Sequence, residues 1–118
     1  MNTIELLETQ HQKNGASNGN DLQTNLRINI KGTLDAVSAP ALKRAIDGLS
    51  TEPGADVTVD LGSLQLIDSR GVSALVSLYK RVLAQGGRMN VVGLANQPLA
   101  MLRLLRLEPL FVRNSVTP

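Results

Sequence analysis

Strand-like and helix-like spacings of apolar residues alternate along most of the chain. Leu26, Ile28 and Ile30 alternate with polar residues, which predicts a strand with one buried face. In chain order the predicted elements are a strand that ends at Gly32, a turn at 33–35, a helix capped by Ser38 that ends before Pro53, a strand at 57–61, a helix at 72–83, a strand at 89–92 and a helix from 96 that ends before Pro109. This order predicts right-handed crossovers and a largely parallel central sheet.

The N-terminal part of the chain is less regular. The pattern at 3–7 is consistent with a short strand that adds an antiparallel edge to the sheet. The segment 10–23 is polar and rich in Asn, Gly and Gln, which is typical of a flexible loop. A chain of 118 residues is large enough for one hydrophobic core and too small for two. We therefore expect a single domain over residues 1–118.

Composition argues against several kinds of site. The chain has no cysteine and a single histidine, so it lacks the ligands of a thiolate or histidine metal centre. His11 lies in the polar segment, where we expect a solvated side chain and not a member of a Ser-His-Asp triad. No apolar run is long enough to span a membrane and no signal-peptide pattern is present, so the cytoplasm is the expected compartment. We expect no metal and no membrane insertion.

The net charge of +2 conceals an asymmetry between the two parts of the chain. Residues 1–68 carry five basic and nine acidic side chains, whereas residues 69–118 carry seven basic and one acidic. An electrostatic partner is therefore expected to meet the second part. The basic residues are dispersed, and Phe and Tyr occur once each, unlike the dense basic stripes with stacking aromatics of nucleic-acid binders. We expect no nucleic-acid partner.

Polar residues follow the predicted strands at positions where functional groups gather in parallel sheets. Asp35 follows the first core strand, and Asp68 and Ser69 precede the helix at 72–83, so all three can share one edge of the sheet. Asp and Ser are also preferred N-cap residues, and Asp35 can be only a turn residue, so none of them requires a function. Gly71 costs about 1 kcal/mol relative to alanine in a helix, which indicates that a partner or a neighbouring strand approaches closely there.

Taken together, these segments resemble the STAS domain, with the greatest similarity to bacterial anti-sigma factor antagonists. The resemblance is carried by Gly-Thr-Leu-Asp at 32–35, the strand at 57–61, Ile-Asp-Ser-Arg-Gly at 67–71, Tyr-Lys-Arg at 79–81 and Gly-Gly-Arg-Met at 86–89. Asp-Ser-X-Gly alone is a weak motif, but the ordered combination is specific. The resemblance implies an α/β STAS fold with its core at about 26–113: a mixed central sheet of about four to five strands with helices packed mainly on one face.

The resemblance implies a regulatory protein that is not an enzyme and needs no cofactor. In this family the antagonist binds an anti-sigma factor with GHKL-type serine kinase activity and frees its sigma factor; phosphorylation abolishes binding and a PP2C-type phosphatase restores it. Ser69 matches the family's phosphoacceptor and Asp35 a residue at the kinase interface. With Asp68, Arg70 and Gly71 they form the expected partner-binding set, in a monomer that forms heterocomplexes. We expect helix N–H groups to accommodate a phosphate on Ser69, so that phosphorylation changes binding and not the fold.

Arg70 departs from the family, which commonly has Ser or Thr at that position. Arg70 excludes a second phosphorylation there, and it can pair with a phosphate on Ser69, contact an acidic kinase surface or only be exposed. Within the same fold, the alternative is a STAS subunit of a membrane-associated ABC lipid-transport complex that binds its ATPase. A signalling scaffold, or an antagonist serving secretion, would look alike at this level. An enzyme has little support, because Asp68 and Ser69 lack a partner base and the chain has no phosphate-cradling glycine loop.

Overall fold

The computed structural model describes residues 3–12, 22–47 and 54–112. Its elements in chain order are β1 (Thr3–Gln12), β2 (Leu22–Leu34), α1 (Ala39–Asp47), β3 (Asp56–Asp60), β4 (Leu64–Ile67), α2 (Ser69–Ala84), β5 (Arg88–Val92), α3 (Asn96–Leu104) and α4 (Glu108–Val112). The strands and helices that the apolar spacing predicts from residue 26 to residue 104 are therefore present in the predicted order.

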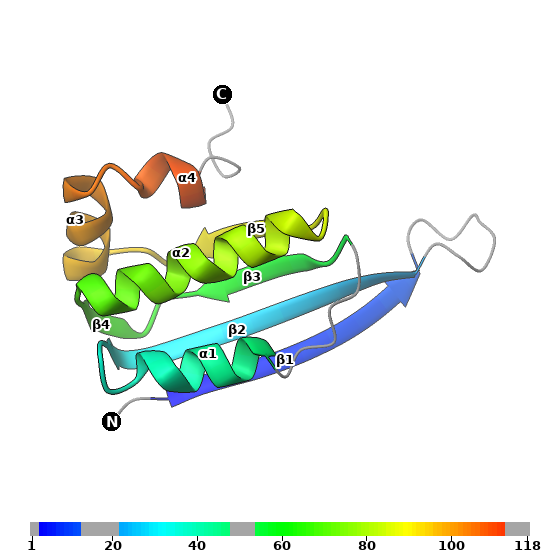
Figure 1. The fold of residues 1–118 in the computed structure, drawn as a ribbon, viewed down its shortest axis with the longest axis horizontal. Coiled ribbons are helices and arrows are strands. Elements are labelled where there is room, and N and C mark those ends of the chain that lie inside the picture. The colour runs from blue at the N-terminus through cyan, green and yellow to red at the C-terminus, as the bar shows by residue number, and fades with distance from the viewer. Residues whose placement is uncertain (1–2, 13–21, 48–53, 113–118) are drawn as a thin grey trace.

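The strands form a mixed sheet in which β2 is central (Figure 1). β1 runs antiparallel to β2, from Thr3 opposite Lys31 to Gln12 opposite Leu22. β2 pairs parallel with β3 and, nearer its carboxyl end, with β4, while β5 pairs parallel with β3. The described sheet thus combines four parallel strands with the antiparallel edge that the sequence predicts.

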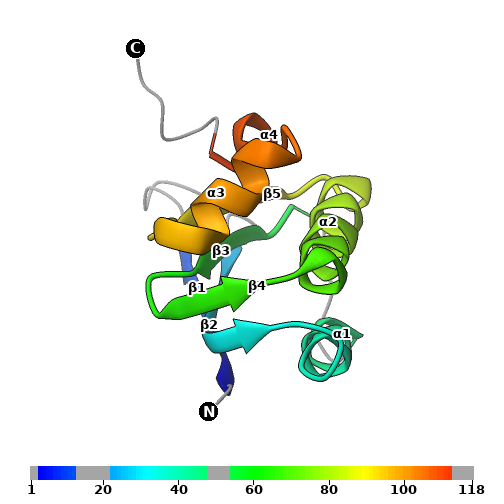
Figure 2. The same ribbon diagram turned by 90° about the vertical axis from the view of Figure 1, so that its left-hand side faces the viewer.

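The helices lie mainly on one face of this sheet (Figures 1 and 2). α1 and α2 are side by side and run in the same direction, because each follows the carboxyl end of one of two parallel strands. α3 packs beside β4, and α4 packs beside β5. The predicted α/β class, with a mixed sheet and helices mainly on one face, is therefore confirmed. None of the described helices is long and apolar enough to cross a membrane.

The hydrophobic core lies between the sheet and the helices. Ile28 and Val59 in the sheet and Leu42, Leu75 and Leu102 in the helices are completely buried. Strand residues between the core positions are mostly polar and point to the opposite face, because successive side chains of a strand alternate. The apolar alternation in the sequence therefore decides which face of the sheet the helices cover.

The N-terminal hairpin is longer than the sequence predicts. The strand expected at 3–7 continues to residue 12, and residues 10–12 pair with the start of β2 at 22–24 where a loop is predicted. Main-chain hydrogen bonds between antiparallel strands need no apolar side chains, so a polar sequence can extend a hairpin. His11 therefore lies in a strand and not in a loop. The rest of the predicted loop, 13–21, lies outside the described residues.

Three further details differ from the prediction. β2 continues through residues 33–34, and the turn begins only at Asp35. A register shift in the pairing with β4 follows Gly32, and the φ of +85° at this glycine permits the irregularity. β4 is not predicted at all, since four residues are too few for a periodic signal. α4 includes Pro109, which the sequence analysis places after a helix end. Proline is tolerated in a first helical turn, where its missing N–H is not needed.

Candidate functional site

The carboxyl ends of β2 and β4 lie next to each other and bring the predicted site residues to one edge of the sheet. Leu34 at the end of β2 is opposite Ile67 at the end of β4. The main-chain N–H of Asp68 donates to the carbonyl of Leu34 at 3.2 Å. The loops that begin with Asp35 and Asp68 are therefore neighbours, as the sequence predicts.

The Asp35 side chain organises the turn into α1. Its Oδ1 accepts hydrogen bonds from the N–H groups of Val37 at 3.0 Å and Ser38 at 3.1 Å. These bonds, above all the one from Ser38, hold the pKa of Asp35 below its ordinary value. Ser38, the predicted N-cap residue, directly precedes α1, and its carbonyl accepts from the Ala41 N–H at 3.0 Å. Its hydroxyl donates to the carbonyl of Thr33 at 2.7 Å and accepts from the Asp35 N–H at 3.0 Å. The turn is thus fixed and anionic, with Val37 82% exposed at its tip.

Asp68 is the N-cap of α2. Its backbone is extended, and its Oδ1 accepts hydrogen bonds from the N–H groups of Arg70 at 2.9 Å and Gly71 at 3.0 Å. The Val72 N–H donates to the Asp68 carbonyl at 2.9 Å and so begins the helical hydrogen bonding. A carboxylate at this position also interacts favourably with the positive end of the helix dipole. Of the two cap residues that the sequence offers, Asp68 is the one that caps.

Ser69 is the first residue of α2, and its side chain is exposed. Within the described part of the chain, no group forms a hydrogen bond with its hydroxyl. The same part of the chain contains no group of His, Cys, Asp and Glu residues that could hold a metal ion. Among the described residues, the site therefore presents an accessible serine oxygen that has no hydrogen-bonding partner.

Gly71 permits close packing inside the protein. The residue is buried, and a Cβ atom there would lie 2.2 Å from the carbonyl oxygen of Leu34 and 2.8 Å from a side-chain carbon of Ile67. The first turn of α2 therefore rests directly on the ends of β2 and β4. Of the two explanations that the sequence leaves open for this glycine, the structure supports packing against a strand. Gly71 fixes the position of Ser69 but does not face outward.

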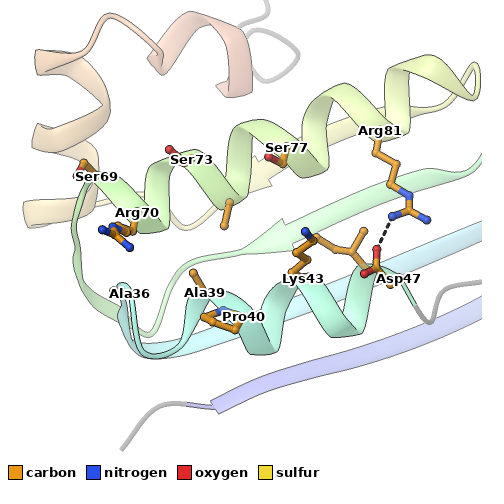
Figure 3. Close-up of a pocket in the computed structure, with 12 residues that line it drawn as sticks. Ala36, Ala39, Pro40, Lys43, Asp47, Ser69, Arg70, Ser73, Ser77 and Arg81 are labelled. Carbon is orange, nitrogen blue, oxygen red and sulfur yellow. Dashed lines mark hydrogen bonds and ion pairs between the residues drawn. The ribbon is translucent and has the colours of Figure 1, made fainter.

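An open groove of about 590 Å³ runs between α1 and α2 (Figure 3). Ser69 and Arg70 lie at one end of it, beside Ala36 of the Asp35 turn. At the other end Arg81 and Asp47 form an ion pair with a distance of 2.6 Å between Nη1 and Oδ1. The exposed hydroxyl therefore stands at the mouth of a groove that both helices line.

A family model described as "Mlab, STAS domain" matches residues 20–113. The chain belongs to the STAS domain family. The anti-sigma-B factor antagonist of Bacillus subtilis (strain 168) is 36% identical over 90 residues, which cover 76% of this chain and 72% of that protein. This STAS domain also has the fold of two solved structures of low sequence identity. An anti-sigma factor antagonist from Mycobacterium paratuberculosis is 20% identical, with a TM-score of 0.64 and coverage of 91% of this chain and 83% of that one. The Bacillus cell fate determinant SpoIIAA in the phosphorylated form is 19% identical, with a TM-score of 0.52 and coverage of 75% and 80%.

One residue that positions the site of this STAS domain escapes the sequence analysis. Gln97, in the first turn of α3, accepts a hydrogen bond from the Ile67 N–H at 2.9 Å and donates to the Ile67 carbonyl at 3.0 Å. Its side-chain amide thus takes the place of a neighbouring strand and holds the residue that precedes Asp68. The sequence marks Gln97 only as part of a helix start, because its partner is thirty positions away.

Proposed function

We propose that this STAS domain is an anti-sigma factor antagonist whose unphosphorylated form binds an anti-sigma factor and so releases the sigma factor. The 36% identity to a protein named as an anti-sigma-B factor antagonist supports the assignment. The observation that carries the mechanism is the exposed and unengaged hydroxyl of Ser69 beside the Asp35 turn. Asp35, Asp68, Ser69 and Arg70 would form the contact surface, with Gly71 supporting it from below.

In this proposal Ser69 is a substrate and the chain is not an enzyme. The anti-sigma factor, as a GHKL-type serine kinase, transfers the γ-phosphoryl group of ATP to Ser69 Oγ; the serine proton passes to a base of the kinase, and ADP leaves. A PP2C-type phosphatase hydrolyses the phosphoserine and restores the hydroxyl. The Asp68 carboxylate beside Ser69 is already engaged by two main-chain N–H groups, which is compatible with a kinase that supplies the base.

Phosphorylation would act on binding more than on folding. It adds about −1.5 to −2 charges at neutral pH. Two N–H groups at the start of α2, which we expected to accommodate the phosphate, already donate to the Asp68 carboxylate. The phosphate would therefore remain in solvent beside Asp68, where a partner would have to desolvate it against a surface fitted to a small hydroxyl.

The test is an affinity pull-down from the source cells with wild-type, Ser69→Ala and Ser69→Asp baits, followed by mass spectrometry. We expect a small kinase-fold protein to be retained by the wild-type and Ser69→Ala chains and lost with Ser69→Asp. Equal retention of a transport ATPase by all three baits would contradict the proposal.

A stability measurement distinguishes loss of binding from loss of structure. Ser69 is exposed and forms no hydrogen bond with another described residue, so Ser69→Asp should change the free energy of unfolding by no more than about 0.5 kcal/mol. Denaturant titration of the purified variant provides this control. A Ser69→Asp chain that unfolds would refute the claim that the fold tolerates the charge.

The second candidate is a STAS subunit of a membrane-associated ABC lipid-transport complex, docked on its ATPase through the same end of α2. The matching family model is described as "Mlab, STAS domain", which names no anti-sigma factor, so family membership does not choose between the two. The pull-down does choose, because the two functions require different partners.

A further inference from the structure

We infer that the groove between α1 and α2 is the docking surface for an acidic segment of the protein partner, with Arg70 and Lys43 as its cationic contacts. The identity of that partner rests on the proposed function, but the acidic character of the segment rests on the groove itself. Three features of the groove support the inference: its shape, its unpaired charges and the place of Ser69.

The shape of the groove fits a stretch of polypeptide better than a single ion. α1 has nine residues, so the groove beside it is about 13 Å long at 1.5 Å per helical residue. The small side chains of Ala39 and Ala74 leave space between the two helices, and Ser73 and Ser77 of α2 also line the groove. An extended or helical segment can therefore lie along it and find both apolar contact and hydrogen-bonding groups.

The acidic side chains around the groove all have partners. At the mouth, Asp35 and Asp68 accept hydrogen bonds from main-chain N–H groups of their own turns. At the far end, Asp47 pairs with Arg81. These carboxylates are therefore already engaged within the protein.

The two remaining cations have no such partner. Figure 3 shows Arg70 extending from α2 and Lys43 from α1 into the space between the helices. Neither forms an ion pair with any residue that the structure describes. The unsatisfied charge in the groove is thus positive, and carboxylates of an incoming segment complement it.

The helix ends add no net positive charge at the mouth of the groove. α1 and α2 both begin at the end where Ser69 lies and run away from it in the same direction (Figure 3). Helix N-termini carry partial positive charge, but the Asp68 carboxylate already accepts hydrogen bonds from N–H groups at the start of α2, and the Asp35 carboxylate accepts them from the turn before α1. An acidic segment is therefore favoured by Arg70 and Lys43 and not by the helix ends.

The arrangement explains how a phosphate on Ser69 would expel the partner. The phosphate would stand at the mouth of a groove that selects negative charge, so it would repel the acidic segment and compete with it for Arg70. Arg70 thus has one role in binding and one in release.

Site-specific photo-crosslinking identifies the occupant. A diazirine-bearing amino acid replaces Ser77 inside the groove or, as a matched control, Arg88, which is exposed on β5. The full-length chain is expressed in the source cells, irradiated and analysed by mass spectrometry. We expect position 77, and not position 88, to crosslink to a segment with more Asp and Glu than Lys and Arg, and the crosslink to disappear with Ser69→Asp. A crosslink to a second copy of this chain, to a segment without acidic excess, or to no protein would overturn the inference.

Affinity measurements with the crosslinked partner test the two cations. Arg70→Gln and Lys43→Gln should each weaken binding about five- to tenfold and flatten the dependence of log Kd on log salt concentration, whereas Arg88→Gln should change neither. Unchanged affinity and salt dependence in both groove variants would overturn the inference. The two proposals fail separately. If a kinase partner crosslinks only at position 88, the groove is not its docking surface, but the proposed function stands. If an acidic segment of a transport ATPase crosslinks at position 77, the groove is the docking surface, but the proposed function is wrong.

Discussion

The four consecutive residues 68–71 occupy four different environments. Asp68 caps α2, Ser69 exposes its hydroxyl, Arg70 extends into the groove and Gly71 is buried against the end of β2. The residue types were enough to predict a helix start here. They were not enough to assign the cap, because Asp and Ser are both good N-caps. Nor could they show that Gly71 serves internal packing, because the nearest atom it approaches, the Leu34 carbonyl oxygen, belongs to a strand far away in sequence.

The environment of Gly71 predicts a large effect of a small substitution. Gly71→Ala places Cβ 2.2 Å from the Leu34 carbonyl oxygen, which is main chain and cannot move aside without displacing β2. We expect the free energy of unfolding to fall by about 2–4 kcal/mol, in spite of the better helix propensity of alanine. Chemical denaturation of the purified variant measures this loss.

Ser73→Ala is the matched control for Gly71→Ala. Ser73 is exposed on the same helix, so its replacement should change stability by no more than about 0.5 kcal/mol. If Gly71→Ala proved as stable as this control, the close contact between α2 and β2 would be wrong.

The Asp35 turn predicts a dependence of stability on pH. The folded-state pKa of Asp35 is lowered from 3.8 by hydrogen bonds from the Ser38 and Val37 N–H groups. A lowered pKa means that the stabilisation is fully present above the unfolded-state pKa and is lost as the pH falls through the folded-state value. We therefore expect Asp35 to weaken its support of the turn as the pH falls below 3.8, with little change near neutrality.

Asp35→Asn isolates this contribution. Its amide oxygen can accept the same hydrogen bonds but does not titrate, so the variant should lose less stability than the wild type between neutral and acidic pH. Parallel urea titrations at a series of pH values give the comparison, and carboxyl NMR gives the pKa directly. Identical pH profiles would show that this carboxylate does not couple to folding.

At the scale of elements, the sequence was most informative where periodic apolar residues meet a core. β3, α2 and β5 begin and end close to their predicted positions. β4 was missed because it is short and depends on pairing with β2, which is distant in sequence. α4 is not predicted, because a proline such as Pro109 usually indicates that a helix has ended. The local spacing of apolar residues therefore predicts the strands and helices that bury one face in the core. The short elements β4 and α4 depend on contacts with residues that are distant in sequence or on the position of a proline.

The contact between α3 and β4 gives the prediction that belongs to this scale. Gln97→Ala removes both hydrogen bonds to Ile67 and leaves that main chain without its partner. We expect a loss of about 1–3 kcal/mol and faster hydrogen exchange at the Ile67 N–H. Gln65→Ala changes an exposed glutamine of β4 whose side chain forms no hydrogen bond with a described residue, and it should have no such effect. Unaltered exchange at Ile67 in the Gln97 variant would contradict a role in positioning Asp68.

At the scale of the whole molecule, a single core joins the sheet to all four described helices. The core cluster includes Leu42 of α1, Leu75 of α2, Leu102 of α3 and Phe111 of α4. The ion pairs Arg27–Asp60, Arg81–Asp47 and Arg103–Glu108 are on the surface, where each contributes at most about 1 kcal/mol. Stability therefore comes mainly from the shared core and depends little on charge.

A shared core predicts one cooperative unfolding transition. Phe111 is 1% exposed, and its ring packs edge-on against Tyr79 of α2, with centroids 5.6 Å apart. Phe111→Ala should lower the free energy of unfolding by about 3–5 kcal/mol. The unfolding midpoints followed by far-UV circular dichroism and by the fluorescence of Tyr79, the one tyrosine of the chain, should shift by the same amount. Separate transitions for the two signals would mean that α4 folds independently of the sheet.

Asp68 caps α2 while Ser69 carries the exposed hydroxyl, so the helix cap and the modifiable group belong to different residues. Attaching or removing a group at Ser69 Oγ breaks no hydrogen bond between described residues, since the hydroxyl takes part in none. A cycle of modification would then need no melting and re-formation of α2. Its pace would be set by the enzymes that act on it, and one molecule could pass through many cycles without exposing its apolar interior to aggregation.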